Sequence, residues 1–365
     1  MFQTEPMTCR LQDVGMFQTE PIICLQHLGN QFFTYLMQQI TQMGYPSLIV
    51  PIIVIAIFGI DFKKSFLLFQ LFMWTDMVTD ILKILVGFPR PYYVDKKVIN
   101  LENNITSTSS FSGNEIKGIF ALPDNQILNT FRLQEAYKSG SLGFPSGHVS
   151  LTTALWGGSV TVFDNRLIKI LTPFAMVLMA FSRVYLGKHF IGDVVGGAIV
   201  GLISIVVFEY FLKSSLKQDF FKKESFELAF RRENLFFYCF MFVIPIFLVA
   251  LSLAHYNPLN FESVGYFFGM NVAYIFTIRT GIPVDTRTAE QRITRAFIAL
   301  LLFMVSKNIL EFLFCATGKI NCPEINCHGF ILMDFLKTFI PLFTIWVSVV
   351  ICTKLNLYRK NEGSL

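Results

Sequence analysis

Three short strings in this 365-residue sequence contain residue types suited to phosphoryl transfer. They are Lys83 with Arg90-Pro91, then Pro145-Ser146-Gly147-His148, then Ser182-Arg183 with His189 and Asp193. Two histidines, an aspartate and three cations can together move a phosphoryl group without a metal ion. Each string lies at the end of an apolar stretch that can cross a bilayer, so all three can meet at one membrane face.

The third string contains the candidate nucleophile. His189 and Asp193 are four residues apart, which would place them one above the other on the first turns of a helix. A carboxylate bonded to one imidazole nitrogen fixes the tautomer and leaves the other nitrogen free to attack. Arg183 ends the preceding apolar stretch, and Leu186-Gly187-Lys188 would form a turn outside the membrane. The alternative is a His-Asp pair that only caps a helix.

The first string offers cations at a helix end. Lys83 and Arg90 are seven residues apart, two helical turns, which predicts that both lie on one face. Pro89 and Pro91 would stop the helix there. A single lysine at such a place can also be a residue that merely extends to the membrane interface.

The second string can bind an anion. Ser146 is a good N-cap for a following helix, whose first backbone N–H groups would point outward. Gly147 would let an anion approach these groups closely, and a helix N-terminus favours phosphate. His148 would stand in the same first turn, beside whatever binds there.

Read in order, K-x6-R-P, P-S-G-H and S-R-x5-H-x3-D, the strings resemble the type 2 phosphatidic acid phosphatase superfamily over residues 83–193. The resemblance implies that His189 attacks phosphorus and becomes a phosphohistidine, and that Asp193 orients it. His148 would protonate the leaving oxygen and then activate water. The residues implied to hold the phosphoryl oxygens are Lys83, Arg90, Ser146, Gly147 and Arg183. No metal or other cofactor is implied.

Composition predicts an all-α, polytopic membrane helix bundle. Hydrophobic residues make up 53% of the chain and charged residues only 15%, against about 25% charged in soluble domains. Apolar runs predict about nine transmembrane helices. They span residues 44–60, 66–87, 149–164, 167–185, 192–212, 235–254, 261–279, 296–316 and 330–352. The first and third are short, so a re-entrant segment is an alternative for either.

Basic residues predict the orientation of these helices. In a nine-span model they gather in alternate loops, which are the cytoplasmic loops. These residues are Lys63, Lys64, Arg166, Lys169, Lys213, Lys217, Lys222, Lys223, Arg231, Arg232, Arg279, Arg287, Arg292, Arg295, Lys354, Arg359 and Lys360. All three strings then face the extracytoplasmic or lumenal side. We expect an integral protein of a bacterial inner membrane, or of the endoplasmic reticulum in a eukaryote.

The chain divides into three predicted parts. Residues 1–43 hold a short duplication, in which Met1–Pro6 recurs as Met16–Pro21, and a possible interfacial helix around residues 32–40. The duplication favours a local copying event or an upstream start over a function. Residues 44–212 form the phosphatase membrane core, including an extracytoplasmic loop at 88–145. Residues 213–365 add transmembrane helices and a cytoplasmic tail.

The substrate is predicted only by class. A site at a bilayer face between apolar helices favours a lipid phosphate or isoprenoid diphosphate entering from the side. One alternative is a soluble phosphoester, as in glucose-6-phosphatase with its similar nine-span layout. Others are a phosphotransferase with an acceptor other than water, and a transporter or structural membrane protein that merely retains the site. The net charge of +5 comes without a basic patch interleaved with aromatics, so nucleic acid is not expected as a partner. Oligomeric state is left open.

Further residues are open to two interpretations. Asp76, Asp80 and Lys83 follow one another at spacings of four and three residues, which places them on one helix face, and we expect the acids to pair with Lys83 or with a neighbouring cation. Alternatively, these acids bind a proton or contact a polar substrate. Cys322 and Cys327 either form a small disulfide or remain free thiols.

Overall fold

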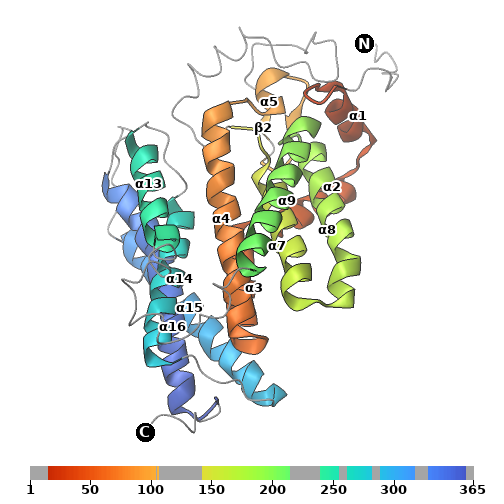
Figure 1. Ribbon diagram of the computed structural model, residues 1–365. Coiled ribbons are helices and arrows are strands. Elements are labelled where there is room, and N and C mark those ends of the chain that lie inside the picture. Colours follow the sequence, from red (N-terminus) through yellow and green to blue (C-terminus); the bar gives the residue numbers. More distant parts are fainter. Residues whose placement is uncertain are drawn as a thin grey trace, which may run out of the picture. The chain divides into compact units, whose positions relative to one another are not determined.

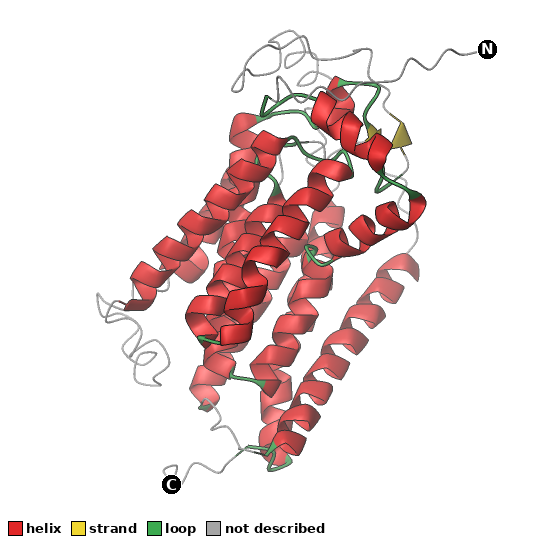
Figure 2. Cartoon of the chain, turned by 90° about the vertical axis from the view of Figure 1, so that its right-hand side faces the viewer, coloured by secondary structure: helices red, strands yellow, loops and turns green. Residues whose placement is uncertain are grey.

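The computed structural model of this chain is built from α-helices. It describes residues 15–103, 105–106, 142–213, 239–254, 261–281, 288–316 and 328–358. Within these ranges the strands are one antiparallel pair of two residues each, β1 (Ile99–Asn100) and β2 (Ile105–Thr106), coloured yellow in Figure 2. The predicted all-α class is confirmed. The predicted Cys322–Cys327 loop lies outside the described residues.

The helices follow the apolar segments of the sequence (Figure 1). They are α1 (Glu20–Leu28), α2 (Gln31–Gln42), α3 (Pro46–Gly59), α4 (Phe62–Val86), α5 (Pro91–Val94), α7 (Gly147–Phe163), α8 (Arg166–Tyr185), α9 (Ile191–Lys213), α13 (Ile244–Ala254), α14 (Phe261–Thr280), α15 (Ala289–Ala316) and α16 (His328–Lys354). A π-helical turn, Cys239–Val243, leads into α13. Each of the nine predicted apolar segments overlaps a helix in the part of the chain that the structure describes.

Five of the described helices are long and apolar enough to cross a membrane: α4, α8, α9, α15 and α16. A sixth span results if α2 and α3, which are bent by 54° at a short break, count as one broken or re-entrant segment. The chain is therefore an integral membrane protein, and the number nine stays a prediction. The helix predicted around residues 32–40 is present as α2.

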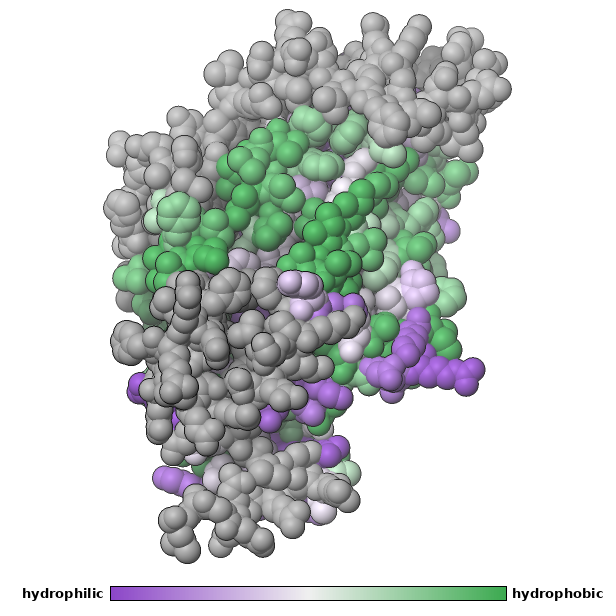
Figure 3. Space-filling view, viewed as in Figure 1, coloured by the Kyte–Doolittle hydropathy of each residue, from purple (hydrophilic) through white to green (hydrophobic). Residues whose placement is uncertain are grey.

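The helix surfaces agree with a lipid environment. On α8 and α9 the exposed side chains are largely aliphatic or aromatic, with Phe174 62% and Val206 67% exposed. Figure 3 shows that hydrophobic residues cover much of the coloured surface. Charged residues instead lie where α7 connects to α8: Asp164, which follows α7, forms an exposed ion pair with Lys169 in the first turn of α8. Such a division is required where hydrocarbon contacts the helix sides.

The described residues belong to two compact units. Unit 1 comprises Met1–Tyr45 and Val78–Ile205, and unit 2 comprises Pro46–Met77 and Val206–Leu365. The three-part division predicted from the sequence stays a prediction. All the residues of the three strings lie in unit 1.

In unit 1, glycines let the helices of the site approach closely. A Cβ at Gly197 would lie 2.5 Å from the Ser146 carbonyl oxygen, and one at Gly201 would lie 2.7 Å from the Ser150 carbonyl oxygen. These two positions of α9 are therefore in direct contact with the backbone of α7, a small-residue interface of the kind that membrane helices use. The Thr79 and Ser150 hydroxyls, 2.8 Å apart, join the end of α4 to α7.

The second copy of the N-terminal repeat has a structural role. Phe17 is buried, and its ring packs against Phe88, Phe144 and Phe190, with centroid distances of 5.5, 6.3 and 5.9 Å. These three rings neighbour the first, second and third string respectively. Phe17 therefore provides one hydrophobic centre for all three strings. The first copy of the repeat lies outside the described residues.

Unit 2 packs by aromatic stacking and close helix contact. The Phe66 and Tyr274 rings stack with centroids 4.1 Å apart, and the Gln70 amide donates to Asn271 Oδ1 at 2.7 Å. Gly269 of α14 lies so close to α16 that a Cβ would be 2.4 Å from the Phe339 carbonyl oxygen. The first half of α4 is thereby fixed to α14.

Candidate active site

The nucleophile candidate lies in the tight turn between α8 and α9. The backbone N–H groups of Lys188 and His189 both donate to the Arg183 carbonyl, at 3.1 and 3.3 Å. Gly187 has a φ of +71°, which a side chain would strain, and a Cβ there would lie 2.5 Å from the Ile99 carbonyl oxygen. This turn brings His189 back toward the end of α8.

His189 is oriented by Asp193, as the spacing predicted. His189 Nδ1 lies 3.3 Å from Asp193 Oδ2, and both side chains are buried. The predicted helical placement of His189 is wrong, because α9 begins at Ile191. The Phe190 N–H donates to Asp193 Oδ2 at 2.9 Å, so the carboxylate caps the helix and contacts the imidazole at once. The Nε2 atom of His189 is the nitrogen that points away from the carboxylate.

The electrostatic surroundings keep His189 neutral. Burial lowers the pKa of the His189 imidazole well below its ordinary value, and the positive charges of Arg90 and Arg183 lower that pKa further. His148 and Lys83 contribute in the same direction. These four residues from all three strings therefore act on one imidazole. A neutral imidazole is the nucleophilic form.

The first string is shaped differently from its prediction. α4 ends at Val86, and Gly87 follows with a φ of +64°, so Arg90 cannot share a helix face with Lys83. Helices commonly end at a glycine in the left-handed region, so Gly87 ends α4 before the chain reaches the two prolines. Arg90 instead precedes the short helix α5, and its guanidinium donates to the Lys188 carbonyl at 3.5 Å.

Lys83 nevertheless reaches the second string. Its Nζ would lie 3.2 Å from a Cβ placed on Gly147, at the start of α7. Asp80 Oδ1 lies 3.0 Å from Lys83 Nζ, so the predicted pairing of Lys83 with an acid of α4 is confirmed for Asp80. Asp76 is also buried.

The second string joins the other two through its backbone. The Ser146 N–H donates to the Asp193 carbonyl at 2.9 Å, and the Gly143 N–H donates to the Phe88 carbonyl at 2.7 Å. Ser146 occupies the N-cap position of α7, but its hydroxyl makes no cap hydrogen bond, so that part of the prediction is wrong. Within the described residues this buried hydroxyl has no hydrogen-bond partner.

His148 is held by ring packing. Its ring meets the Tyr45 ring edge to face, with centroids 4.4 Å apart and planes at 89°. Its buried Nε2 atom has no hydrogen-bond partner among the residues that the structure describes. A Cβ placed on Gly44 would lie 2.7 Å from His148 Cδ2, so the glycine at this position leaves the room that the ring occupies. The imidazole is therefore positioned while one nitrogen remains available to a proton.

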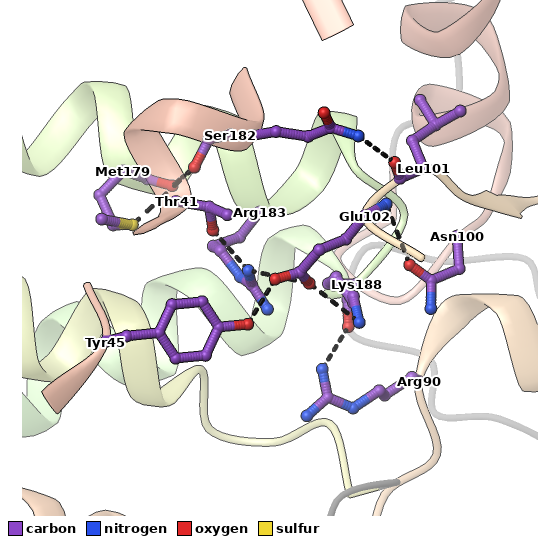
Figure 4. Close-up of polar contacts among 11 residues, drawn as sticks. Thr41, Tyr45, Arg90, Asn100, Leu101, Glu102, Met179, Ser182, Arg183 and Lys188 are labelled. Carbon is purple, nitrogen blue, oxygen red and sulfur yellow. Dashed lines mark hydrogen bonds and ion pairs between the residues drawn. The ribbon is translucent and has the colours of Figure 1, made fainter. Parts of the chain in front are cut away.

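Sequence reasoning missed a polar cluster beside the site. Figure 4 shows the Glu102 carboxylate among the side chains of Tyr45, Arg183 and Lys188. Lys188 directly precedes His189, so its place in the sequence could have indicated that it lies near the site. Glu102 gave no such indication, because it lies in the long segment between the first two strings.

Across the described ranges, no group of three or more His, Cys, Asp or Glu side chains could hold a metal ion.

Comparison with known proteins gives a consistent result. The PAP2 superfamily model matches residues 65–217, which include every residue of the three strings. Lipid A 4'-phosphatase of Bacteroides thetaiotaomicron is 32% identical over 79 residues, 22% of this chain and 35% of that protein. Lipid A 4'-phosphatase of Porphyromonas gingivalis is 36% identical over 67 residues, 18% and 28% of the two chains.

A plant protein is also similar. Lipid phosphate phosphatase 2 of Arabidopsis thaliana is 31% identical over 144 residues, 35% of this chain and 43% of that protein. The chain thus spans less than half the length of each of these curated relatives. No solved structure matches it. The family match confirms the resemblance inferred from the three strings.

Proposed function

We propose that this chain, whose residues 65–217 belong to the PAP2 superfamily, is a membrane-integral phosphatase that hydrolyses a lipid phosphate without a metal ion. The observation that carries the proposal is the environment of His189. Asp193 contacts one of its nitrogens, and the cations Lys83 and Arg90 of the first string and Arg183 of the third act on its imidazole. Such an arrangement suits attack on a phosphoryl group surrounded by cations.

The proposed reaction has two steps. In the first, His189 Nε2 forms a bond to phosphorus, the phosphorus–oxygen bond of the ester breaks, and His148 gives a proton to the leaving oxygen. In the second, His148 takes a proton from water, the water oxygen attacks the phosphohistidine, and inorganic phosphate leaves with His189 restored. The proposed role of Asp193 is to keep the His189 proton on Nδ1.

Five groups are proposed to hold the phosphoryl oxygens. These are Lys83, Arg90, Arg183, the Ser146 hydroxyl, which has no hydrogen-bond partner among the described residues, and the backbone N–H group of Gly147. The start of α7 supports this role, because the first N–H groups of a helix lack partners within the helix. Lys83 Nζ beside Gly147 adds a positive charge at the same place.

A lipid substrate is favoured for two reasons. The site lies at the ends of apolar helices, whose exposed sides suit hydrocarbon. The similar proteins are named as phosphatases of lipid A or of lipid phosphates. We further propose that the site faces away from the cytoplasm. The basic residues gather in the loops on the other side of the predicted membrane, and loops rich in Lys and Arg are cytoplasmic.

The test is phosphate release by the purified protein in detergent with EDTA present. The substrates are phosphatidate, an isoprenoid diphosphate and glucose 6-phosphate. We expect the lipid substrates to have the higher kcat/KM and vanadate, which mimics the five-coordinate transition state, to inhibit. A higher kcat/KM for glucose 6-phosphate would reject the lipid class. Release of phosphate from none of the substrates would reject the phosphatase.

A further inference from the structure

Glu102 places a negative charge among the cations of the proposed phosphate site. Its side chain is 7% exposed. Glu102 Oε2 lies 2.9 Å from Lys188 Nζ and 3.5 Å from Arg183 Nη1 (Figure 4). Its other oxygen accepts a hydrogen bond from the Tyr45 hydroxyl. This acid does not belong to the three strings.

The backbone that carries Glu102 is fixed to the same turn as His189. The Leu101 N–H donates to the Leu186 carbonyl at 3.2 Å, and the Gln38 amide donates to the Leu101 carbonyl at 2.6 Å. The Glu102 N–H donates to Asn100 Oδ1 at 3.2 Å. The carboxylate is therefore held in place by its own segment as well as by its ion pairs.

The Glu102 side chain is ionised at neutral pH. Burial alone would raise its pKa, but Arg183, the Tyr45 hydroxyl and Lys188 together lower the pKa below the ordinary value of a glutamate. Arg183 is 2% exposed, and it also donates to the Thr41 hydroxyl at 2.5 Å. A buried guanidinium without a counter-charge would be costly, so Glu102 and Thr41 stabilise Arg183 while no phosphate is bound.

The same guanidinium is proposed above to hold the phosphoryl oxygens. A phosphate dianion that approaches Arg183 therefore meets the like charge of Glu102 within a poorly solvated site. A lipid substrate has binding energy from its tail to offset this repulsion. Inorganic phosphate, the proposed product, has no such part. The carboxylate should thus weaken the binding of both by a similar factor, but the lipid keeps the affinity that its tail supplies, whereas inorganic phosphate is left weakly bound.

We propose that Glu102 is a specificity-determining residue that competes with phosphate for Arg183 and Lys188 and thereby favours release of inorganic phosphate. The inference rests on the proposed function for the position of the bound phosphate. The proposed role and a purely positioning role predict opposite changes in phosphate affinity when Glu102 is replaced. Loss of a positioning residue would weaken phosphate binding, whereas loss of a competing charge would strengthen it.

The experiment measures the Kd of inorganic phosphate for the full chain in detergent, from the rise of Tm with phosphate concentration. We expect Glu102→Gln to lower this Kd about tenfold or more. Glu102→Asp, which keeps the charge, should stay within about threefold of wild type. Glu20→Gln removes the same charge from an exposed position of α1 and should leave the Kd unchanged.

Glu102→Ala serves as a second variant if Glu102→Gln does not fold, and it should lower the Kd as well. A Kd that is unchanged or higher in the neutral variant would overturn the inference, as would a lack of phosphate binding by both wild type and variant. Phosphate binding that becomes measurable only in the neutral variant would support it. Because the readout needs no turnover, failure of the proposed phosphatase activity is detected separately, by phosphate release from the substrates.

Discussion

The two histidines of the candidate site are held in different ways. His189 lies in the turn before α9, where Asp193 contacts its Nδ1 atom at 3.3 Å. His148 lies in the first turn of α7, where the Tyr45 ring packs on its imidazole and no described residue bonds its Nε2 atom. One imidazole is thus oriented by a carboxylate and the other by an aromatic ring.

This difference suits two different tasks. A nucleophile must keep one tautomer throughout, and a carboxylate on Nδ1 provides that. A general acid that later acts as a base must lose and regain a proton in each cycle, so a strong ion pair would hold it in a single state. Packing against the Tyr45 ring fixes the position of His148, and no described residue bonds its Nε2 atom. The difference agrees with the proposed roles, in which the nucleophile lies in the α8–α9 turn and the proton is transferred at the start of α7.

The largest effect should come from removing the nucleophile. His189→Ala should abolish phosphate release, since no bond to phosphorus can form. Asp193→Asn should lower kcat by about 10³-fold or more, because an amide N–H toward Nδ1 would move the imidazole proton onto Nε2. The measurement is initial-rate phosphate release, together with a rapidly quenched wild-type reaction. The quenched protein should carry acid-labile, base-stable phosphate.

A matched control is available for this substitution. His27 is exposed in the last turn of α1, and His27→Ala should keep wild-type activity. Undiminished turnover by His189→Ala would contradict the assignment of the nucleophile to the α8–α9 turn.

A smaller effect, dependent on the leaving group, should follow from removing the acid. His148→Ala should slow hydrolysis of an alkyl phosphate by about 10²- to 10⁴-fold, because its leaving oxygen needs a proton. An activated aryl phosphate needs little protonation, so its rate should fall much less. The ratio of the two kcat/KM values, in variant and wild type, is the quantity to measure. Equal losses on both substrates would instead indicate that His148 binds phosphate.

Much of this arrangement could be predicted from local sequence. The four-residue spacing of His189 and Asp193 predicted their contact, and the apolar segments predicted the helices, because both depend on neighbours along the chain. Arg90 could not be placed correctly, since the left-handed conformation of Gly87 ends α4 earlier than the prolines suggested. The pairing of Lys83 with Asp80 was predictable for the same local reason.

The surroundings of His148 could not be predicted. Tyr45 and Glu102 are 57 residues apart, and their hydrogen bond depends on how the N-terminal helices pack against the turn at Gly187. No periodicity or spacing in the sequence relates such distant positions. Similarly, the repeat around Phe17 gave no sign that one copy packs against aromatic neighbours of all three strings.

The smallest effect should come from the ring that positions His148. An edge-to-face aromatic contact contributes about 0.5–1.5 kcal/mol, so Tyr45→Leu should lower kcat for an alkyl phosphate by about two- to tenfold. Tyr45→Phe keeps the ring and should retain a kcat within about twofold of wild type. Tyr35→Leu, at an exposed position of α2, controls for loss of a tyrosine. A loss in Tyr45→Phe as large as that in Tyr45→Leu would mean that the hydroxyl, through Glu102, positions His148, and the two histidines would then both depend on carboxylates.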